Sequence, residues 1–488
     1  MLGRRRSLSC VSETPEIRAA QTIDSVLIFS PPQTHNIRKH RMRTSFSLAL
    51  LLGFSLLLGI TSSAQQTRDK PRLKTFGSSL KKLKWDPERN QTSDTTSPGS
   101  ATEPDDDVVR FETSLVASDV LVLDRQGRAV KGLVASDFII AEDGKPEPVG
   151  HFLLGSNTSV PRSIALIIDY SGSQFPFIQN SVEAAKVLVD KLGALDRMAI
   201  ITDDIEMLCD FTNNKAELKK KLDVLIERSR GKKGILGFGG KNRRLGLSAQ
   251  YSALMATLKE AFDEEDQRPI IVFQTDGDEA KYLRNSIIKP SVPAGLPPEW
   301  IPSAQADVEA QLKLQRDGMT EFSLDDVYRA VEKSRATIYT VIPELKFVGL
   351  TPEQQVEAVR ADDARAMSEW LPTLSKGAQA AFKARDEARR KLTPVQALRY
   401  RAEELAKLQL ALMEVSNMSG GWTEFLESPS QAQMIYSRIF ADINDRYIVG
   451  YYPSNKTRDG RRRKISIEVK GHPEYTIIGR RSYYAGGR

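Results

Sequence analysis

The feature that most constrains the fold is a run of five apolar residues at 164–168, which ends directly in the polar sequence DYSGS at 169–173. An uninterrupted apolar run of this length is typical of a strand buried on both faces of a parallel sheet. In open sheets of parallel strands, the loops at the carboxyl ends of the strands form the ligand crevice. The sequence therefore predicts a buried strand whose following loop presents a carboxylate and two hydroxyls to a binding crevice.

Strands and helices alternate along residues 161–345. The predicted strands lie at 164–168, 198–201, 207–211, 270–273 and 337–342, and helices with one apolar face separate most of them. This alternation indicates an α/β fold, a doubly wound and mostly parallel sheet flanked by helices.

Two segments interrupt the alternation. Residues 285–318 are proline-rich at their start, and we expect an inserted loop that caps one face of the domain. Residues 346–418 are rich in Ala, Arg, Glu and Lys, and we expect a helical insertion. Its apolar residues between Val395 and Val415 recur at three- and four-residue steps for less than three heptads, which favours a helix packed on its own domain over a coiled coil. Residues 419–446 should complete the α/β domain.

A second pattern, of short strands, occupies both ends of the folded part of the chain. Residues 108–155 contain short apolar segments separated by turns of Asp and Gly, which is typical of a small β-sandwich-like unit. Residues 447–488 contain further strands with no helix between them. We therefore expect the late strands to join the early ones in one accessory β unit.

The amino-terminal leader, residues 1–64, has the pattern of a secretory signal. Basic residues precede an apolar stretch at 46–60, and small residues end at Ala64. This pattern predicts a signal peptide at about 42–64, cleaved after Ala64, and a protein that is secreted or periplasmic with no membrane span after cleavage. Residues 65–107 are polar and acidic at their end, so we expect a disordered linker.

Charge and composition exclude several classes of function. The 488 residues carry a formal net charge of +7, but most of the excess lies in the leader, so the mature chain is nearly neutral and no nucleic-acid partner is expected. Only His151 and His472 would remain after cleavage, far apart in sequence, which argues against a zinc site and a Ser/His/Asp triad. Cys209 would be the single remaining cysteine, so no internal disulfide is expected.

Three loops at the same predicted sheet edge carry oxygen donors. The first supplies Asp169, Ser171 and Ser173, the second supplies Ser248, and the third supplies Asp276. Such hard ligands suit Mg²⁺, Mn²⁺ or Ca²⁺. Taken alone, each signal is weak, because Ser248 could be a helix N-cap and Asp276 could belong to an ordinary turn. Together, each after the appropriate element, they predict a divalent metal site.

This combination resembles the von Willebrand factor A (VWFA) family, whose metal-ion-dependent adhesion site (MIDAS) reads D-x-S-x-S, then a Thr, then an Asp. The resemblance maps the family's Thr onto Ser248, within the sequence GLSAQYSAL at 246–254. More narrowly, residues 120–152 and the sequence YIVGYYP at 447–453 are similar to the secreted VWFA-related proteins of acidobacteria. The resemblance implies a VWA-type, Rossmann-like fold and a magnesium site.

The leading functional hypothesis is an exported, metal-ion-dependent protein-binding module of the adhesion type. A shell with several neutral hydroxyls leaves the ion with residual positive charge, so a carboxylate from a protein partner would complete it. One alternative is a carboxylate- and metal-dependent hydrolase that uses Asp203, Asp204, Asp276, Asp278 and Glu279. No nucleophile paired with a base is visible, so an enzyme is not expected. Another alternative is a scaffold whose metal site is unoccupied.

Overall fold

The described part of the chain belongs to one compact unit, Thr67–Arg488. The computed structural model describes residues 71–80, 84–86, 91–93, 115–157, 160–230, 248–263, 268–373 and 376–486. The expected leader and its cleavage site at Ala64 lie outside these residues. Within them, every helix is too short or too polar to span a bilayer.

A six-stranded sheet lies at the centre, in the order β12-β11-β10-β7-β8-β9. Five of its strands are parallel, and the edge strand β9 is antiparallel to β8. The strands are β7 (Arg162–Ile168), β8 (Arg197–Thr202), β9 (Met207–Thr212), β10 (Arg268–Gln274), β11 (Thr337–Ile342) and β12 (Thr423–Phe425). The chain runs from β7 outward to β9 and then returns to β10 on the other side of β7. The carboxyl ends of β7 and β10 therefore form the topological switch point, where open α/β sheets bind ligands.

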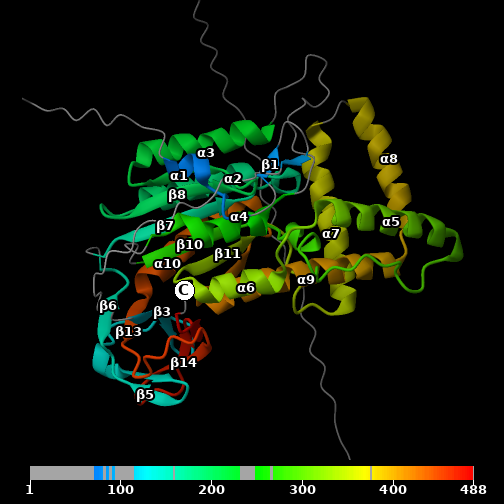
Figure 1. Ribbon diagram of the computed structural model, residues 1–488. Helices are drawn as coiled ribbons and strands as arrows, with labels where there is room; N and C mark the ends of the chain where they lie inside the picture. The colour runs from blue at the N-terminus through cyan, green and yellow to red at the C-terminus, as the bar shows by residue number, and fades with distance from the viewer. Residues whose placement is uncertain are drawn as a thin grey trace, which may run out of the picture. The chain divides into compact units, whose positions relative to one another are not determined.

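Helices cover both faces of this sheet (Figure 1). In β7, Ile164, Leu166 and Ile168 pack in the core on one face, and Ala165 and Ile167 pack in the core on the other, as the pleat of a strand requires. The first face is covered by α2 (Ile178–Asp190), α3 (Lys215–Arg230) and α10 (Ala432–Asp445). The second is covered by α4 (Gln250–Ala256), α6 (Leu324–Lys333) and α9 (Val395–Ser419). The prediction of a doubly wound α/β fold is confirmed.

Two four-stranded antiparallel sheets form the accessory β unit, in the orders β15-β3-β13-β6 and β16-β14-β4-β5. Early and late strands alternate in the first sheet, where Val120 of β3 lies opposite Tyr447 of β13, and in the second the late strand β14 pairs with the early strand β4. Inward-facing residues of the two sheets share one core. The strands are β3 (Val116–Leu123), β4 (Phe138–Glu142), β5 (Lys145–Glu147), β6 (His151–Leu154), β13 (Tyr447–Tyr451), β14 (Arg462–Val469), β15 (Thr476–Ile478) and β16 (Ser482–Tyr484).

The two inserted segments differ from the expectation. The second half of 285–318 is not a loop, because Ile301–Gly318 forms the 18-residue helix α5. Pro302 lies in the first turn of α5, where a missing N–H costs nothing, the other prolines precede the helix, and good helix formers follow. The segment 346–418 is not a single insertion either. Helices α7 (Pro352–Trp370) and α8 (Lys376–Leu392) are inserted, whereas α9 packs against the sheet and connects β11 to β12.

Part of the expected linker is folded. The short helix α1 (Pro71–Thr75) precedes Phe76, which is buried in the core on the second face of the sheet. The main-chain N–H of Gly77 donates to Glu260 Oε2 at 2.7 Å and fixes this segment to the domain. Strands β1 (Lys84–Asp86) and β2 (Gln91–Ser93) form an antiparallel pair further along. An average composition over 65–107 hides the one aromatic side chain that anchors the segment.

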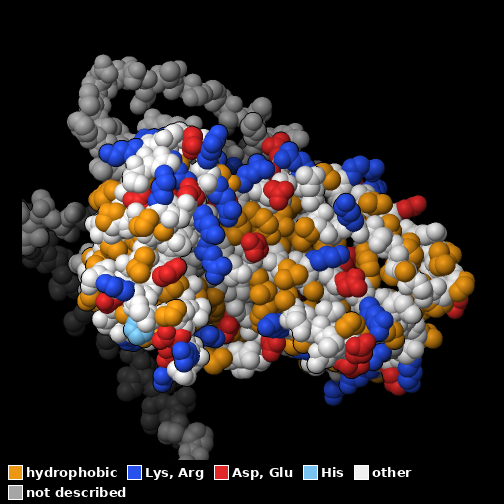
Figure 2. All heavy atoms as spheres, turned by 90° about the horizontal axis from the view of Figure 1, so that it is seen from below, with side chains coloured by type: hydrophobic (Ala, Val, Ile, Leu, Met, Phe, Trp, Pro, Cys, Tyr) orange, Lys and Arg blue, Asp and Glu red, His pale blue; other side chains and the backbone are white. Residues whose placement is uncertain are grey.

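The surface seen from below mixes charges of both signs. Figure 2 shows Lys and Arg side chains interspersed with Asp and Glu over this face, with apolar side chains between them. Such a mixture agrees with the nearly neutral mature chain predicted from the sequence.

Candidate metal centre

The loops after β7 and β10 lie side by side because the strands that precede them are neighbours in the sheet. The main-chain N–H of Asp169 donates to Gln274 O at 3.0 Å, and that of Thr275 donates to Val341 O at 3.1 Å. These bonds extend the ladder by one residue past the strand ends. Asp169 and Asp276 are thereby held at the switch point, and both are buried, at 1% and 4% exposure.

A chain of hydrogen bonds joins four of the five predicted ligands. The main-chain N–H of Ser171 donates to Asp169 Oδ1 at 2.9 Å. The hydroxyl oxygens of Ser171 and Ser173 lie 3.1 Å apart, and the Ser173 hydroxyl donates to Asp276 Oδ2 at 2.6 Å. Ser173 is exposed, so the cluster has one side open to solvent. Two carboxylates and two hydroxyls therefore converge as the D-x-S-x-S spacing predicts.

The fifth predicted ligand, Ser248, contacts a different carboxylate. Its hydroxyl donates to Asp203 Oδ2, and the main-chain N–H of Ala249 donates to Asp203 O at 3.0 Å. Ser248 is also not the N-cap of α4, since Ala249 holds that position without a side-chain cap. Asp203 follows β8 at the same sheet edge, so Ser248 lies next to the cluster and contacts Asp203 rather than Ser171 or Ser173.

Two glutamines complete the site, and the motif did not identify them. Gln250 Nε2 donates to Asp169 Oδ2 at 2.6 Å and to Asp276 Oδ1 at 2.9 Å, so its amide bridges the two carboxylates. Gln174 Nε2 donates to Asp276 Oδ2 at 2.9 Å. The Oε1 atoms of both glutamines are buried and have no hydrogen-bond partner among the described residues. Their only signal in the sequence is position, since Gln174 follows Ser173 and Gln250 lies two residues after Ser248.

Buried carboxylates dominate the electrostatic environment of this edge, where Lys281 pairs with Asp278. Burial, together with the charges of Asp203 and Asp276, raises the pKa of Asp169 well above its usual value. Burial raises the pKa of Glu279 to about 7 and raises that of Glu344 well above its usual value. A cation between Asp169 and Asp276 would relieve this repulsion directly.

The donor set fits a hard divalent cation. Asp169, Asp276 and the two serine hydroxyls supply oxygen ligands, and an unpartnered amide oxygen lies on each glutamine beside them. Within the described ranges, no group of three or more His, Cys, Asp or Glu side chains could by itself hold a metal ion. A bound ion would therefore depend on the hydroxyls and on water.

Three carboxylates of the hydrolase alternative accept hydrogen bonds from neighbouring residues at this edge. Asp203 accepts from the main-chain N–H of Tyr170 at 3.3 Å and from Ser248, and Asp204 accepts from the Tyr170 hydroxyl at 2.9 Å. Glu279 accepts from the Ser252 hydroxyl at 2.6 Å. These bonds hold the loop after β8 and the start of α4 in place.

Comparison with known proteins yields matches among solved structures only. No protein-family profile matches the chain, and no curated protein does. Proximal thread matrix protein 1 of the mussel byssus is 12% identical with a TM-score of 0.26, covering 58% of this chain and 47% of its own. The vWF domain of the type V pili tip protein Mfa5 from Porphyromonas gingivalis is 14% identical with a TM-score of 0.31, covering 58% and 95%. Manganese-loaded TRAP protein from Plasmodium vivax is 13% identical with a TM-score of 0.21, covering 42% and 61%.

These likenesses are remote. This chain spans about half the length of the mussel protein, and all three TM-scores lie below 0.5. The assignment of an α/β fold therefore depends on the strand order, the parallel register and the two helical layers of this chain itself.

Proposed function

We propose that this chain is an exported binding module of the adhesion type, in which Asp169, Ser171, Ser173 and Asp276 hold a Mg²⁺ or Mn²⁺ ion. Ca²⁺ is a weaker candidate, because it prefers more ligands than these four residues supply. A carboxylate of a partner protein would take an open position on the ion. Export is part of the proposal, and it is supported by the signal-peptide pattern at 42–64.

The observation that carries the proposal is the hydrogen-bonded chain from Asp169 through Ser171 and Ser173 to Asp276. Two buried carboxylates this close repel each other without a cation, and the neutral hydroxyls add ligands without adding negative charge. The ion would keep residual positive charge, and the exposed side of Ser173 gives a partner access to it. A carboxylate is the ligand that such an ion attracts most strongly.

Calorimetry with Mg²⁺ and Mn²⁺ on the exported protein tests the metal site. We expect the native protein to bind one ion and Asp169→Asn to bind none, because the variant loses the charge that balances the ion. Asp317→Asn is the matched control, since Asp317 is exposed on α5 and pairs with its neighbour Arg316. Equal binding by the native protein and Asp169→Asn would remove this site and leave the scaffold alternative.

Capture from envelope extract tests the partner. The native protein should retain a protein ligand in Mg²⁺ and release it in EDTA, and Asp169→Asn should retain none in either condition. Turnover of phosphoester or peptide substrates that requires Asp169 would instead favour a hydrolase. The proposal assigns no catalytic role to the chain.

A further inference from the structure

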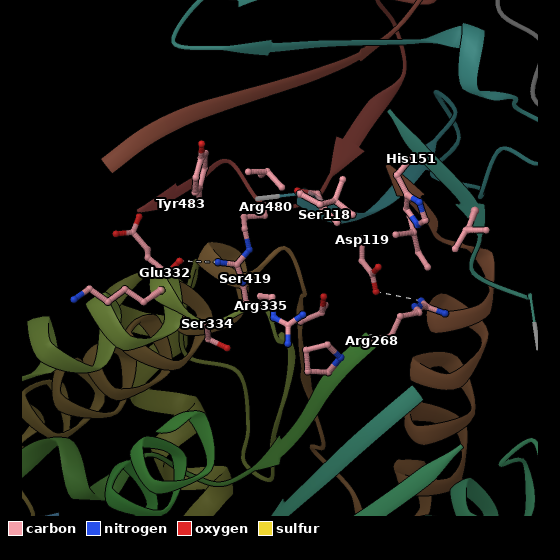
Figure 3. Close-up of a pocket in the computed structure, with 18 of the residues that line it drawn as sticks. Ser118, Asp119, His151, Arg268, Glu332, Ser334, Arg335, Ser419, Arg480 and Tyr483 are labelled. Carbon is pink, nitrogen blue, oxygen red and sulfur yellow. Dashed lines mark hydrogen bonds and ion pairs between the residues drawn. The ribbon is translucent and has the colours of Figure 1, made fainter. Parts of the chain in front are cut away.

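A cavity lies at the opposite edge of the central sheet, between that sheet and the β unit. It has a volume of about 540 Å³ and is lined by residues of β3, β6, α6 and the strand starts Arg268, Pro269 and Thr337 (Figure 3). Pockets of this size bind small molecules. Nothing in the metal site reaches it, because the two lie at opposite ends of the strands.

The charged side chains of this pocket are not balanced among themselves. Its lining includes four cationic residues against two carboxylates: Arg268, Lys333, Arg335 and Arg480 against Asp119 and Glu332. Both carboxylates already have cationic partners. Asp119 pairs with Arg268 at 3.1 Å, and Glu332 pairs at 2.7 Å with Arg462, which lies outside the lining. The lining therefore carries more cationic than acidic side chains, and Arg335 Nη2 also donates to Asp263 O at 3.1 Å outside the lining.

Arg480 is the most unusual of these cations. Its side chain is buried, and its hydrogen bonds to described residues go to main-chain carbonyls, those of Val331, Glu332 and Ala336. Burial lowers its pKa to about 10, against the opposing effects of Glu332 and Asp119. A guanidinium in this position gains from an anion that enters the pocket, since a charge-assisted bond adds to its neutral carbonyl contacts.

Two further arginines lie around the same space. Figure 3 shows Arg335 near Arg480 on one side and Arg268 with Asp119 on the other. Arg268 is buried, donates to Gly155 O at 2.8 Å and to Ile443 O at 3.1 Å, and has an Nε without a partner among the described residues. Unsatisfied buried donors of this kind are rare in folded proteins.

Part of the remaining wall is apolar, beside polar residues such as Ser118, His151 and Ser419. The apolar part is formed by side chains from β3, β6, β13 and the loop before β7: Leu115, Val116, Leu153, Val160 and Ile448. Leu115 is 39% exposed at the margin of the cavity. A ligand that fills this space therefore needs an anionic end for the guanidinium groups and an apolar body for these walls.

We propose that this pocket binds a small organic carboxylate with an aliphatic body, its carboxylate held between Arg335 and Arg480. A carboxylate matches the planar fork of a guanidinium and needs little of the cavity, which leaves the apolar walls for the chain. Inorganic phosphate lacks the apolar body and would leave those walls uncovered. The inference is independent of the metal site.

Calorimetry on the full chain with sodium octanoate tests the proposal, with octylammonium and inorganic phosphate as comparison probes. Octanoate should bind, and binding should weaken as salt is added. Arg335→Gln should weaken it about 10-fold, as expected for one charge-assisted bond. Arg329→Gln is the matched control, since Arg329 lies on α6, just before Arg335 in sequence but outside the pocket, and it should change the affinity less than about 2-fold. Binding should be the same in Mg²⁺ and in EDTA.

A second variant keeps the test independent of the exposed Arg335. Arg480→Lys retains the charge but loses the fork, and we expect about 10-fold weaker binding. If circular dichroism shows that this variant is unfolded, Ser334→Trp, which fills the cavity from its margin, replaces it and should abolish binding. The proposal is overturned if octanoate fails to bind below its micelle concentration, if octylammonium or phosphate binds as tightly, or if Arg335→Gln binds like Arg329→Gln.

Discussion

The two edges of the central sheet carry opposite charge. At the carboxyl ends of the strands, Asp169 and Asp276 are buried beside each other with hydroxyls and amides as neighbours. At the amino ends, Arg162 and Arg268 occupy directly paired positions of β7 and β10 and are buried as well. Burying charge is costly at either edge, so each must be compensated by its surroundings.

The compensation differs between the edges. Arg162 donates to both carboxylate oxygens of Asp196 and to Asn444 Oδ1 at 2.6 Å. Asp169 and Asp276, by contrast, receive only neutral donors from the contacts described above, and burial together with the neighbouring carboxylates raises the pKa of Asp169. The amino edge is therefore largely compensated within the protein and serves the structure, whereas the carboxyl edge retains a need for a cation. The pocket at Arg480 is an exception at the amino edge, since the hydrogen bonds of this buried guanidinium to described residues go to main-chain carbonyls.

The largest effect is expected where the amino edge is broken. Arg446 is fully buried, donates to Asp442 Oδ2 at 2.8 Å and to Gly420 O at 2.7 Å, and joins α10 to the β unit. Arg446→Met should lower the free energy of unfolding by about 3–5 kcal/mol, because it leaves Asp442 buried without its cation. Arg438→Met, on the exposed side of the same helix, is the control and should cost less than about 1 kcal/mol. Urea unfolding compares the two variants. Equal losses of unfolding free energy would contradict the conclusion that the buried charges of the amino edge stabilise the fold.

The carboxyl edge should make the metal-free protein less stable as the pH rises. Burial raises the pKa of Glu279 from 4.5 to about 7. Between these values the folded chain holds a proton that the unfolded chain releases, so the unfolding free energy falls with rising pH. The contribution of this group is on the order of 3 kcal/mol. Urea unfolding in EDTA from about pH 5 to about pH 8 should show a smaller fall in Glu279→Gln. If the unfolding free energy of Glu279→Gln fell with pH as steeply as that of the native protein, the raised pKa of Glu279 would be contradicted.

The amino edge should have the opposite pH dependence. Burial tends to raise the pKa of Asp196, but hydrogen bonds from Arg162 and Gly193 outweigh it and hold the pKa below its usual value. Stability from this pair is present above the usual value of 3.8 and is lost as the pH falls through the lower folded value. Asp196→Asn should cost about 2 kcal/mol at neutral pH and progressively less in acid. If Asp196→Asn lowered the free energy of unfolding equally at neutral pH and in acid, this interpretation would be contradicted.

The smallest effect separates the two kinds of serine at the candidate metal centre. Ser173→Ala should weaken Mg²⁺ binding about 10-fold, because its hydroxyl lies between the ion's other ligands. Ser248→Ala should weaken it only about 2-fold, since the Ser248 hydroxyl contacts Asp203. Ser248→Thr keeps that hydroxyl and should bind the ion as well as the native protein. Calorimetry ranks the three variants by Mg²⁺ affinity. A larger loss of affinity in Ser248→Ala than in Ser173→Ala would indicate that Ser248 binds the ion directly.

Local pattern was sufficient for much of the fold. A continuous apolar run at 164–168 can be buried only on both faces, and helical periodicity between the strands then requires two layers. Strand β12 has only three residues, too few for any period, and it is identified by its pairing with β11. Phe76 was missed for a related reason, because one anchoring side chain does not change the composition of the segment around it.

The contacts of the candidate site were likewise only partly predictable from local sequence. The spacing of Asp169, Ser171 and Ser173 within one loop predicts their proximity, since few residues separate them. The contact of Ser248 with Asp203 and the bridging amide of Gln250 depend on how α4 packs on the sheet. No local rule contains that information, because amide side chains carry no charge and are common at helix starts.

The pairing of early and late strands determines the order in which this chain can complete its fold. The main-chain N–H of Leu133 donates to the Tyr447 hydroxyl across 314 residues of sequence. During synthesis β3 and β4 emerge first and must wait, with unpaired edges, until β13 and β14 follow. Contacts this distant in sequence form slowly, and the entire α/β domain lies within the loop that they close. The β unit is therefore the last part to form, and premature termination even close to the carboxyl end would leave its first strands without partners.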